Sequence, residues 1–261
     1  MHPLELILIN GDLKGGTTKP LEIWATDEYS NAGKYVVKNF RYDAVDNYST
    51  AKEIIACEIA MKFDIPVPDY AIINISDEDL KGYYNEFEMA RLKNGYKFCS
   101  KFVEQCAMFN PLVSNDFLNQ YEIENVFAFD VLMHNSDRGG YRNKPNLLIN
   151  DNELMMIDHE LTLPFINSIA SEPNYEKSLQ NYRYFNHILI DHVKSIATKN
   201  HIFEEFLEIL HRINFEALHA VFDDMDKYEI AYGNRNDYLH YFIWCKQNVE
   251  TLRKYLLLMI K

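Results

Sequence analysis

Residues 133–150, MHNSDRGGYRNKPNLLIN, place polar and turn-forming side chains between two segments that are rich in apolar residues. Before this stretch, apolar residues recur with helical spacing, and we expect a helix over residues 116–135. After it, the short runs at 146–149 and 154–157 flank the turn residues NDNE, which indicates a pair of strands. The stretch is therefore predicted to be a loop that runs from a buried helix into a buried hairpin.

Oxygen-bearing side chains stand at the ends of these elements. Asn135 and Asp137 follow the helix, while Asn146 stands at the start of the hairpin and Asp158 at its end. Mg²⁺ takes oxygen ligands and keeps several waters, so an Asn amide, an Asp carboxylate and ligand phosphates suit it. A further acid close to the metal, but not bound to it, would accept a proton from a hydroxyl group. This combination is what phosphoryl transfer requires.

The N-terminal part of the chain supplies a candidate phosphate contact. Lys38 ends the apolar core of the run KYVVKNF, and a helix predicted at 49–65 follows it with Glu53 and Glu58. In phosphoryl transfer of the protein-kinase type, a strand lysine on the phosphates is held by a helix glutamate. Lys38 and a glutamate of this helix are therefore a candidate pair.

The loop NGDLKGGTTKP, residues 10–20, offers a second phosphate contact although it lacks the spacing G-x-G-x-x-G. Backbone N–H groups of Gly15, Gly16, Thr17 and Thr18 would form a nest for an anion. A pair of glycines is equally common in an ordinary hairpin turn, and both interpretations remain.

The rest of the chain changes from strands to helices near residue 110. Before it, β-branched or aromatic runs bounded by turn residues predict strands at 4–10, 21–26, 34–40, 69–75 and 96–103. One helix interrupts these strands, with Ser49 or Thr50 as its N-cap and Pro66 beyond its end. Further helices are expected at 202–222, with a break near Asn214, and at 237–260.

This order of elements predicts the fold class. We expect an α+β chain with a small β-rich lobe that holds one helix, residues 1–105, and a larger helical lobe, residues 106–261. There is no Gly/Ser-rich linker, so the lobes are expected to pack as one unit.

The composition disfavours several classes of protein. With 39 acidic and 26 basic residues the formal net charge is −13, which would repel a nucleic-acid backbone. The four cysteines have no C-x-x-C spacing, so we expect buried thiols rather than disulfides or zinc. The N-terminus has no basic, apolar leader, and no apolar run reaches about 18 residues. We expect a cytoplasmic protein that directly contacts neither nucleic acid nor membrane.

Several residues near the loop have plainer interpretations. Arg138 either orients the loop by hydrogen bonds or pairs with a surface acid. His134 and His159 flank the acids, but the H-E-x-x-H spacing of zinc hydrolases is absent, so we expect structural or exposed histidines. The aromatic run YLHYFIW, residues 238–244, is expected to form the core of the last helix.

The motifs NSDRGGYRNKPNLLIN and LMMIDHELTL, with YVVK and KEIIACEIAMKFDIPVPDY upstream, resemble those of HipA-like serine/threonine kinases, in particular the short forms of this branch of the protein-kinase-like fold. The resemblance covers roughly residues 4–165 and implies a two-lobed kinase that uses ATP and Mg²⁺. It assigns Lys38 to the nucleotide phosphates and Glu53 to holding that lysine.

The resemblance also assigns roles in the loop and hairpin. It makes Asp137 the catalytic acid/base, and we group Arg138 with it as a catalytic candidate. Asn146 and Asp158 would bind the metal. Asn143 is the alternative to Asn146, because the asparagine of the family follows its aspartate more closely.

Three functions remain in view. The first is a kinase that transfers the γ-phosphate of ATP to a hydroxyl of a protein substrate. The second keeps the fold and changes the acceptor to a lipid headgroup or a small molecule. The third is a nucleotide-binding pseudokinase that acts as an interaction module, with a partner that neutralises it as an antitoxin neutralises a toxin.

Overall fold

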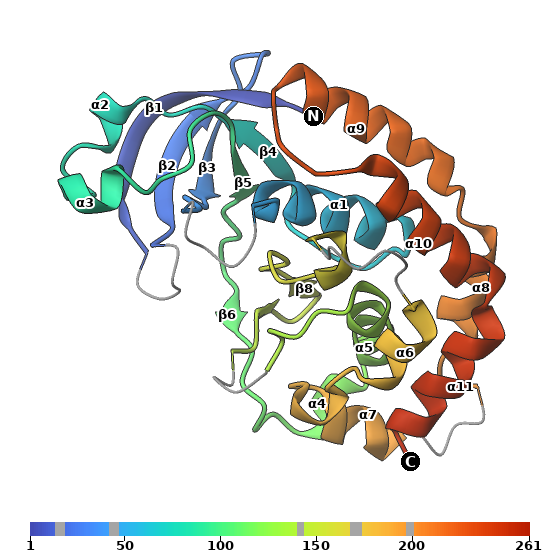
Figure 1. The fold of residues 1–261 in the computed structure, drawn as a ribbon. Coiled ribbons are helices and arrows are strands. Elements are labelled where there is room, and N and C mark those ends of the chain that lie inside the picture. Colours follow the sequence, from blue (N-terminus) through green and yellow to red (C-terminus); the bar gives the residue numbers. More distant parts are fainter. Residues whose placement is uncertain (14–18, 42–46, 140–143, 168–173, 197–200) are drawn as a thin grey trace. The chain divides into compact units, whose positions relative to one another are not determined.

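The computed structural model describes residues 1–13, 19–41, 47–139, 144–167, 174–196 and 201–261 (Figure 1). These residues form two compact units. The first comprises Met1–Ile55, Pro68–Glu104 and His219–Tyr232, and the second comprises Ala56–Val67, Gln105–Leu218 and Gly233–Lys261. The chain passes from one unit to the other within helix α1, Ser49–Lys62.

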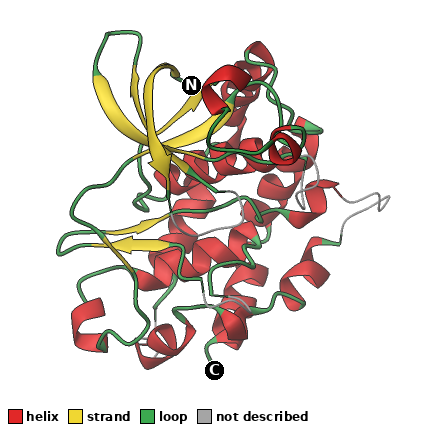
Figure 2. Cartoon of the chain, turned by 90° about the vertical axis from the view of Figure 1, so that its left-hand side faces the viewer, coloured by secondary structure: helices red, strands yellow, loops and turns green. Residues whose placement is uncertain are grey.

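Five strands of the first unit close into a barrel in the order β1-β2-β3-β5-β4. They are among the curved yellow arrows in the upper part of Figure 2. Neighbouring strands are antiparallel, except that β1 and β4 pair in parallel. In β2 the buried residues Leu21, Ile23 and Ala25 alternate with half-buried ones, which is the period of a strand with one face on a core. The strand bounds are Pro3–Asp12 (β1), Leu21–Thr26 (β2), Ala32–Val37 (β3), Tyr70–Ile73 (β4) and Lys97–Lys101 (β5).

Two short helices between β4 and β5 correct the expectation of one helix among these strands. They are α2, Asp77–Leu80, and α3, Glu86–Met89, and each is a single turn. Ser76 and Asn85 cap them by accepting backbone N–H groups at the helix starts. Four residues are too few to show a helical period, so only the capping residues signalled them. Most of helix α9, Leu218–Lys227, also belongs to this unit.

The second unit is mainly helical and contains a small sheet. Strands β6, β7 and β8 form an antiparallel sheet in that order, with Leu147 opposite Met156. The strand bounds are Ala107–Met108, Leu147–Ile149 and Leu154–Met156. The helices are Asn115–Leu118 (α4), Ile123–Met133 (α5), Tyr175–Gln180 (α6), Ile190–Ile196 (α7), Glu204–Arg212 (α8), Arg235–Gln247 (α10) and Val249–Met259 (α11), and the 3₁₀ turns are Pro164–Asn167 (η1), Tyr184–Asn186 (η2) and Phe215–Ala217 (η3).

Two of the predicted long helices are wrong in their extent. The segment 116–135 is divided into α4 and α5, and the segment 237–260 is divided into α10 and α11. At the second break the N–H of Asn248 binds the carbonyl groups of Trp244 and Cys245, which ends α10. The break expected near Asn214 is confirmed, since α8 ends at Arg212 and Asn214 caps the next turn.

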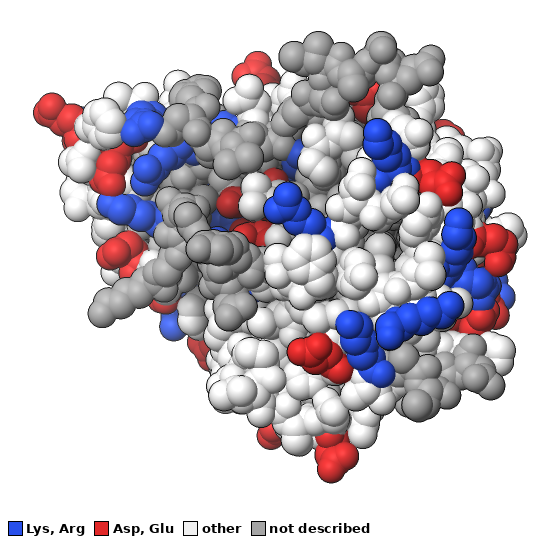
Figure 3. All heavy atoms as spheres, turned by 60° about the horizontal axis from the view of Figure 1, so that its bottom comes forward, with Lys and Arg blue, Asp and Glu red and all other residues white. Residues whose placement is uncertain are grey.

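The α+β class, with a β-rich N-terminal part and a helical C-terminal part, is confirmed. The lobes predicted at 1–105 and 106–261 remain a prediction. Among the described helices, none is long and apolar enough to cross a bilayer. On the face of the molecule drawn in Figure 3, basic side chains lie beside acidic ones.

Candidate active site

The predicted loop begins at the end of helix α5, in the second unit. Every residue of α5 from Asn125 to Met133 is buried, so the helix is held on all sides. His134 ends it in the left-handed conformation, with a φ of 51°. The N–H of Asn135 then binds the carbonyl of Asp130 at 2.8 Å, a pattern that closes the last turn. The position from which the loop starts is therefore fixed by a buried helix end.

The carboxylate of Asp130 on α5 is the anchor of the loop. Its Oδ2 atom accepts hydrogen bonds from Nε of Arg138 and, at 2.9 Å, from Nε2 of His187. Its Oδ1 atom accepts a hydrogen bond from Nδ2 of Asn135 at 2.9 Å. Burial alone would raise the pKa of Asp130, but Arg138 and His187 outweigh it and lower the pKa to about 2. The carboxylate is therefore charged at neutral pH and holds three side chains.

Arg138 connects the loop to the hairpin. Its Nη1 donates to the carbonyl oxygen of Asn146 and, at 3.4 Å, to that of Ile157. Both Arg138 and Asp130 have fully buried side chains, so the expected alternative of a surface ion pair is wrong. These contacts hold the loop against the hairpin, and the assignment of Arg138 as a catalytic residue remains a prediction.

Asp137 contacts one of the predicted metal ligands directly. Nδ2 of Asn146 lies 3.2 Å from Oδ2 of Asp137, and Nζ of Lys144 lies 3.2 Å from the same oxygen. The backbone N–H of Asp137 binds Oδ1 of Asn135 at 3.1 Å. The side chain of Asp137 is 18% exposed and that of Lys144 is 23% exposed, so solvent reaches both side chains. Hydrogen bonds thus hold both the backbone and the side chain of Asp137.

Asn146 and Asp158, the two predicted metal ligands, flank the β7–β8 hairpin. The N–H of Ile157 binds the carbonyl of Asn146 at 3.0 Å, which extends the β7–β8 pairing by one residue pair. Asn146 and Asp158 both have positive φ angles, 47° and 66°. Such a conformation is uncommon outside glycine and is found preferentially at functional sites.

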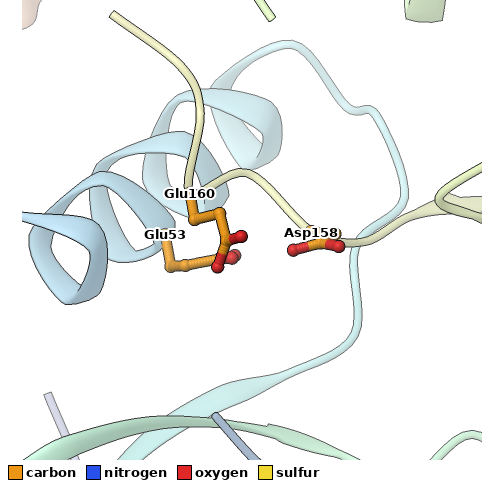
Figure 4. A group of neighbouring side chains, drawn as sticks. All are labelled: Glu53, Asp158 and Glu160. Carbon is orange, nitrogen blue, oxygen red and sulfur yellow. The ribbon is translucent and has the colours of Figure 1, made fainter. Parts of the chain in front are cut away.

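Glu160 lies beside Asp158 on the segment that follows β8 (Figure 4). A carboxylate oxygen of Glu160 and one of Asp158 lie within 4.8 Å of each other. Two carboxylates at that separation suit a hard divalent cation. The Asn146 amide remains a predicted further ligand.

The second candidate pair lies in the first unit. Nζ of Lys38 forms an ion pair with Oε1 of Glu53, whose side chain is almost completely buried. The Glu53 side chain extends from helix α1 (Figure 4). The N–H of Lys38 binds the carbonyl of Phe98 at 3.0 Å, so the lysine directly continues the pairing of β3 with β5. The contact between Lys38 and Glu53 is the one expected from the sequence. Their role in binding a nucleotide remains a prediction.

Comparison with known proteins agrees with these motifs. The sequence matches the family model described as HipA-like kinase over residues 7–223. The chain belongs to the HipA-like kinase family. It is also similar to the crystal structure of the Helicobacter pylori proinflammatory kinase CtkA, with 13% sequence identity, a TM-score of 0.48, and coverage of 98% of this chain and 94% of that chain. No curated protein matches the sequence.

Some residues predicted for this HipA-like kinase lie outside the described part of the chain. They are Gly15, Gly16, Thr17 and Thr18 of the loop after β1, and Asn143, the alternative to Asn146. Of the two asparagines, Asn146 is described and contacts Asp137. The buried histidines His134 and His159 were expected to be structural or exposed, and burial excludes the exposed alternative.

Sequence reasoning missed four residues of this HipA-like kinase site. Lys144 and Glu160 stand two residues from Asn146 and Asp158, and the acidic pair in IDHE was a visible signal for Glu160. Asp130, a charged residue inside the apolar run FAFDVLM, was a visible signal for a buried ion pair, because buried charges are paired. His187 had no signal, since only the tertiary fold brings it to Asp130.

Proposed function

We propose that this HipA-like kinase is an ATP- and Mg²⁺-dependent phosphotransferase that modifies a serine or threonine hydroxyl of a protein substrate. The contact between Asp137 and Asn146, at 3.2 Å, carries the proposal. It joins a candidate proton acceptor and a candidate metal ligand in one hydrogen-bonded group, and it lies within the segment that matches the family. Phosphoryl transfer depends mainly on positioning and charge stabilisation, which such a group would supply.

The proposed step assigns one task to each residue. Asp137 orients the acceptor hydroxyl and takes its proton as the hydroxyl oxygen bonds to the γ-phosphorus and the bond to the β–γ bridging oxygen of ATP breaks, releasing ADP. Asn146 and Asp158, with Glu160 beside them, would hold Mg²⁺. When bound, the ion neutralises negative charge on the phosphate oxygens. Lys144 places a positive charge 3.2 Å from the Asp137 carboxylate, where the reacting group would arrive.

Lys38 and Glu53 support the nucleotide part of the proposal. A lysine that is tied to a buried glutamate has a fixed ammonium group, and a fixed ammonium group binds phosphate with little loss of side-chain entropy. In the proposal Lys38 contacts the ATP phosphates and Glu53 holds it in place.

Binding and transfer are tested together on the purified chain. Millimolar Mg-ATP should stabilise the parent protein by roughly 2.7 kcal/mol if it exceeds the dissociation constant about a hundredfold. Lys38→Ala and Asp158→Asn should reduce that gain, whereas Lys101→Ala, an exposed lysine paired with Asp69, should not. Absence of any thermal shift in the parent would refute the nucleotide site.

The acceptor is tested with γ-labelled ATP, Mg²⁺ and a cell lysate. Label on protein supports the proposed kinase. Label only on lipid or on a small molecule would replace the protein acceptor with one of those acceptors. Binding of Mg-ATP without any transfer would refute the enzyme and favour a pseudokinase that acts through a partner.

A further inference from the structure

Two buried tyrosines from the C-terminal part of the second unit donate their hydroxyl groups to the start of the loop. The hydroxyl of Tyr182 donates to the carbonyl of Asn135 at 2.6 Å. The hydroxyl of Tyr241, on helix α10, donates to the carbonyl of Leu132 on α5. These two carbonyls lie on either side of His134, the residue at which the helix ends. The tyrosines therefore bind the backbone at the point where the direction of the loop is set.

The ring of His134 lies in an aromatic cage that includes the same tyrosines. Its centroid is 6.1 Å from that of Tyr182, 5.8 Å from that of Tyr241 and 5.6 Å from that of Phe165. The left-handed backbone of His134 directs the chain out of the helix, and a ring enclosed on three sides resists rotation of that residue. The cage and the two hydrogen bonds therefore restrain the same turn.

The last carbonyls of a helix have no partner within the helix, so another group must bind them. In α5 the carbonyl of Val131 accepts the N–H of His134 at 3.2 Å, and that of Met133 accepts the N–H of Leu163 at 2.8 Å. The carbonyl of Leu132 accepts the Tyr241 hydroxyl instead. Loss of a hydrogen bond by a buried hydroxyl is energetically costly, so the Tyr241 side chain caps the end of α5.

Burial raises the pKa of Tyr182 and that of Tyr241 well above the ordinary value of 10.0. Both hydroxyls therefore stay protonated, and both remain donors, over the working range of pH. Tyr182 lies within the segment that matches the family, residues 7–223, while Tyr241 lies beyond it.

We propose that Tyr182 and Tyr241 are positioning residues for Asp137: their hydroxyls fix the backbone at Leu132 and Asn135 and thereby hold the Asp137 carboxylate in its reactive place. The part of this inference that concerns catalysis rests on the proposed function. The link is short, since the N–H of Asp137 binds Oδ1 of Asn135, the residue whose carbonyl Tyr182 holds.

The test uses Tyr182→Phe and Tyr241→Phe, which remove one hydroxyl each and keep the ring. The control is Tyr255→Phe, whose hydroxyl binds Glu176 at 3.1 Å on an exposed part of the same C-terminal region. We expect kcat per folded molecule to fall about tenfold or more in each buried variant, because a displacement of about 1 Å costs up to about a hundredfold. The KM for ATP should stay within about twofold, and the control should match the parent in both constants.

A second measurement does not depend on activity. Hydrogen exchange of the backbone amides of residues 134–139 should accelerate at least severalfold in Tyr182→Phe and Tyr241→Phe, and should not change in the control. Unchanged exchange at these amides would overturn the proposal even if the chain transfers no phosphate. Faster exchange with an unchanged kcat in an active enzyme would also overturn it, because the turn would then be loosened without effect on Asp137. An inactive parent with faster exchange would refute the proposed function and confirm only the restraint of the turn.

Discussion

The ion pair between Asp130 and Arg138 should be the costliest polar contact of the site to remove. We consider Asp130→Asn, which keeps the shape of the side chain and removes its charge. Both partners are fully buried, so the guanidinium of Arg138 would be left without a counter-charge in a medium of low dielectric. Removal of one partner of a buried pair costs about 3–5 kcal/mol.

The pKa of Asp130 gives a second estimate of the stability lost when the charge of this carboxylate is removed. A fall from the ordinary value of 3.8 to about 2 corresponds to roughly 2–3 kcal/mol of stabilisation, at about 1.4 kcal/mol per pKa unit. This is the cost of neutralising the carboxylate by protonation. An amide costs more, because it also turns an N–H₂ group towards the donors of Arg138, His187 or Asn135, so we expect a total loss between about 3 and 5 kcal/mol.

The assay is urea unfolding at pH 7 followed by circular dichroism. The control is Asp69→Asn, whose pair with Lys101 is 3.7 Å long and largely exposed, and which should lose less than about 1 kcal/mol. The parent should also lose most of this stabilisation as the pH falls from about 4 to about 2, since a carboxyl group with a lowered pKa stabilises the fold only while it is ionised. If the free energy of unfolding of Asp130→Asn lies within 1 kcal/mol of the parent value, the anchoring role of Asp130 is wrong.

Two further predictions concern the same loop. Burial lowers the pKa of His134 from 6.5 to about 4, so between these values the unfolded chain binds a proton that the folded chain does not, and the free energy of unfolding should fall by about 2 kcal/mol from pH 7.5 to pH 5. In His134→Asn, whose asparagine tolerates the positive φ, unfolding curves at the two pH values should show a correspondingly smaller fall. An equal fall in the variant would contradict the assignment of this pH dependence to His134. Gly139 has a φ of +100°, and a β-carbon there would meet the carbonyl oxygen of Asn186 at 2.2 Å and the backbone nitrogen of Ile188 at 2.7 Å. Gly139→Ala should therefore lower the melting temperature more than the control Gly82→Ala, where φ is +101° and no heavy atom lies within 4 Å of the added carbon. Equal melting temperatures of the two variants would contradict this prediction and show that the backbone near Gly139 shifts to make room.

The local elements could be predicted where the sequence pattern is complete within a few residues. The strand at 21–26 has the predicted bounds, because its alternation and its flanking turn residues lie within the run itself. The helix predicted at 49–65 ends at Lys62, since the chain already turns through Asp64, whose φ is 54°, before it reaches Pro66. A proline marks where a helix cannot continue, and the actual end lies up to a turn earlier.

The long helices show the limit of a periodic pattern. Apolar spacing continues through Asn248, so the segment 237–260 reads as one helix, although the side chain and backbone of Asn248 both bind the carbonyl of Trp244 and end it. The prediction that the aromatic run forms core is confirmed, because Tyr238, Tyr241 and Phe242 are buried on α10.

In the site, too, some residues could be predicted from local sequence and others could not. Asp137, Asn146 and Asp158 lie on one loop and one hairpin, so their spacing in the sequence was enough to group them. The residues that hold this loop, Tyr182 and His187, come from a later part of the chain. Their hydroxyl and imidazole groups bind the loop only through the tertiary fold, which no local pattern encodes.

We propose Asp137 as the proton acceptor in phosphoryl transfer, and the single-turnover rate of transfer from Mg-ATP by Asp137→Asn tests this role. The substitution keeps the shape and the contact with Asn146 possible, but it removes the group that accepts the proton. We expect a rate lower by about a hundredfold or more, with affinity for Mg-ATP within a few-fold of the parent. A parental rate of transfer in Asp137→Asn would contradict it.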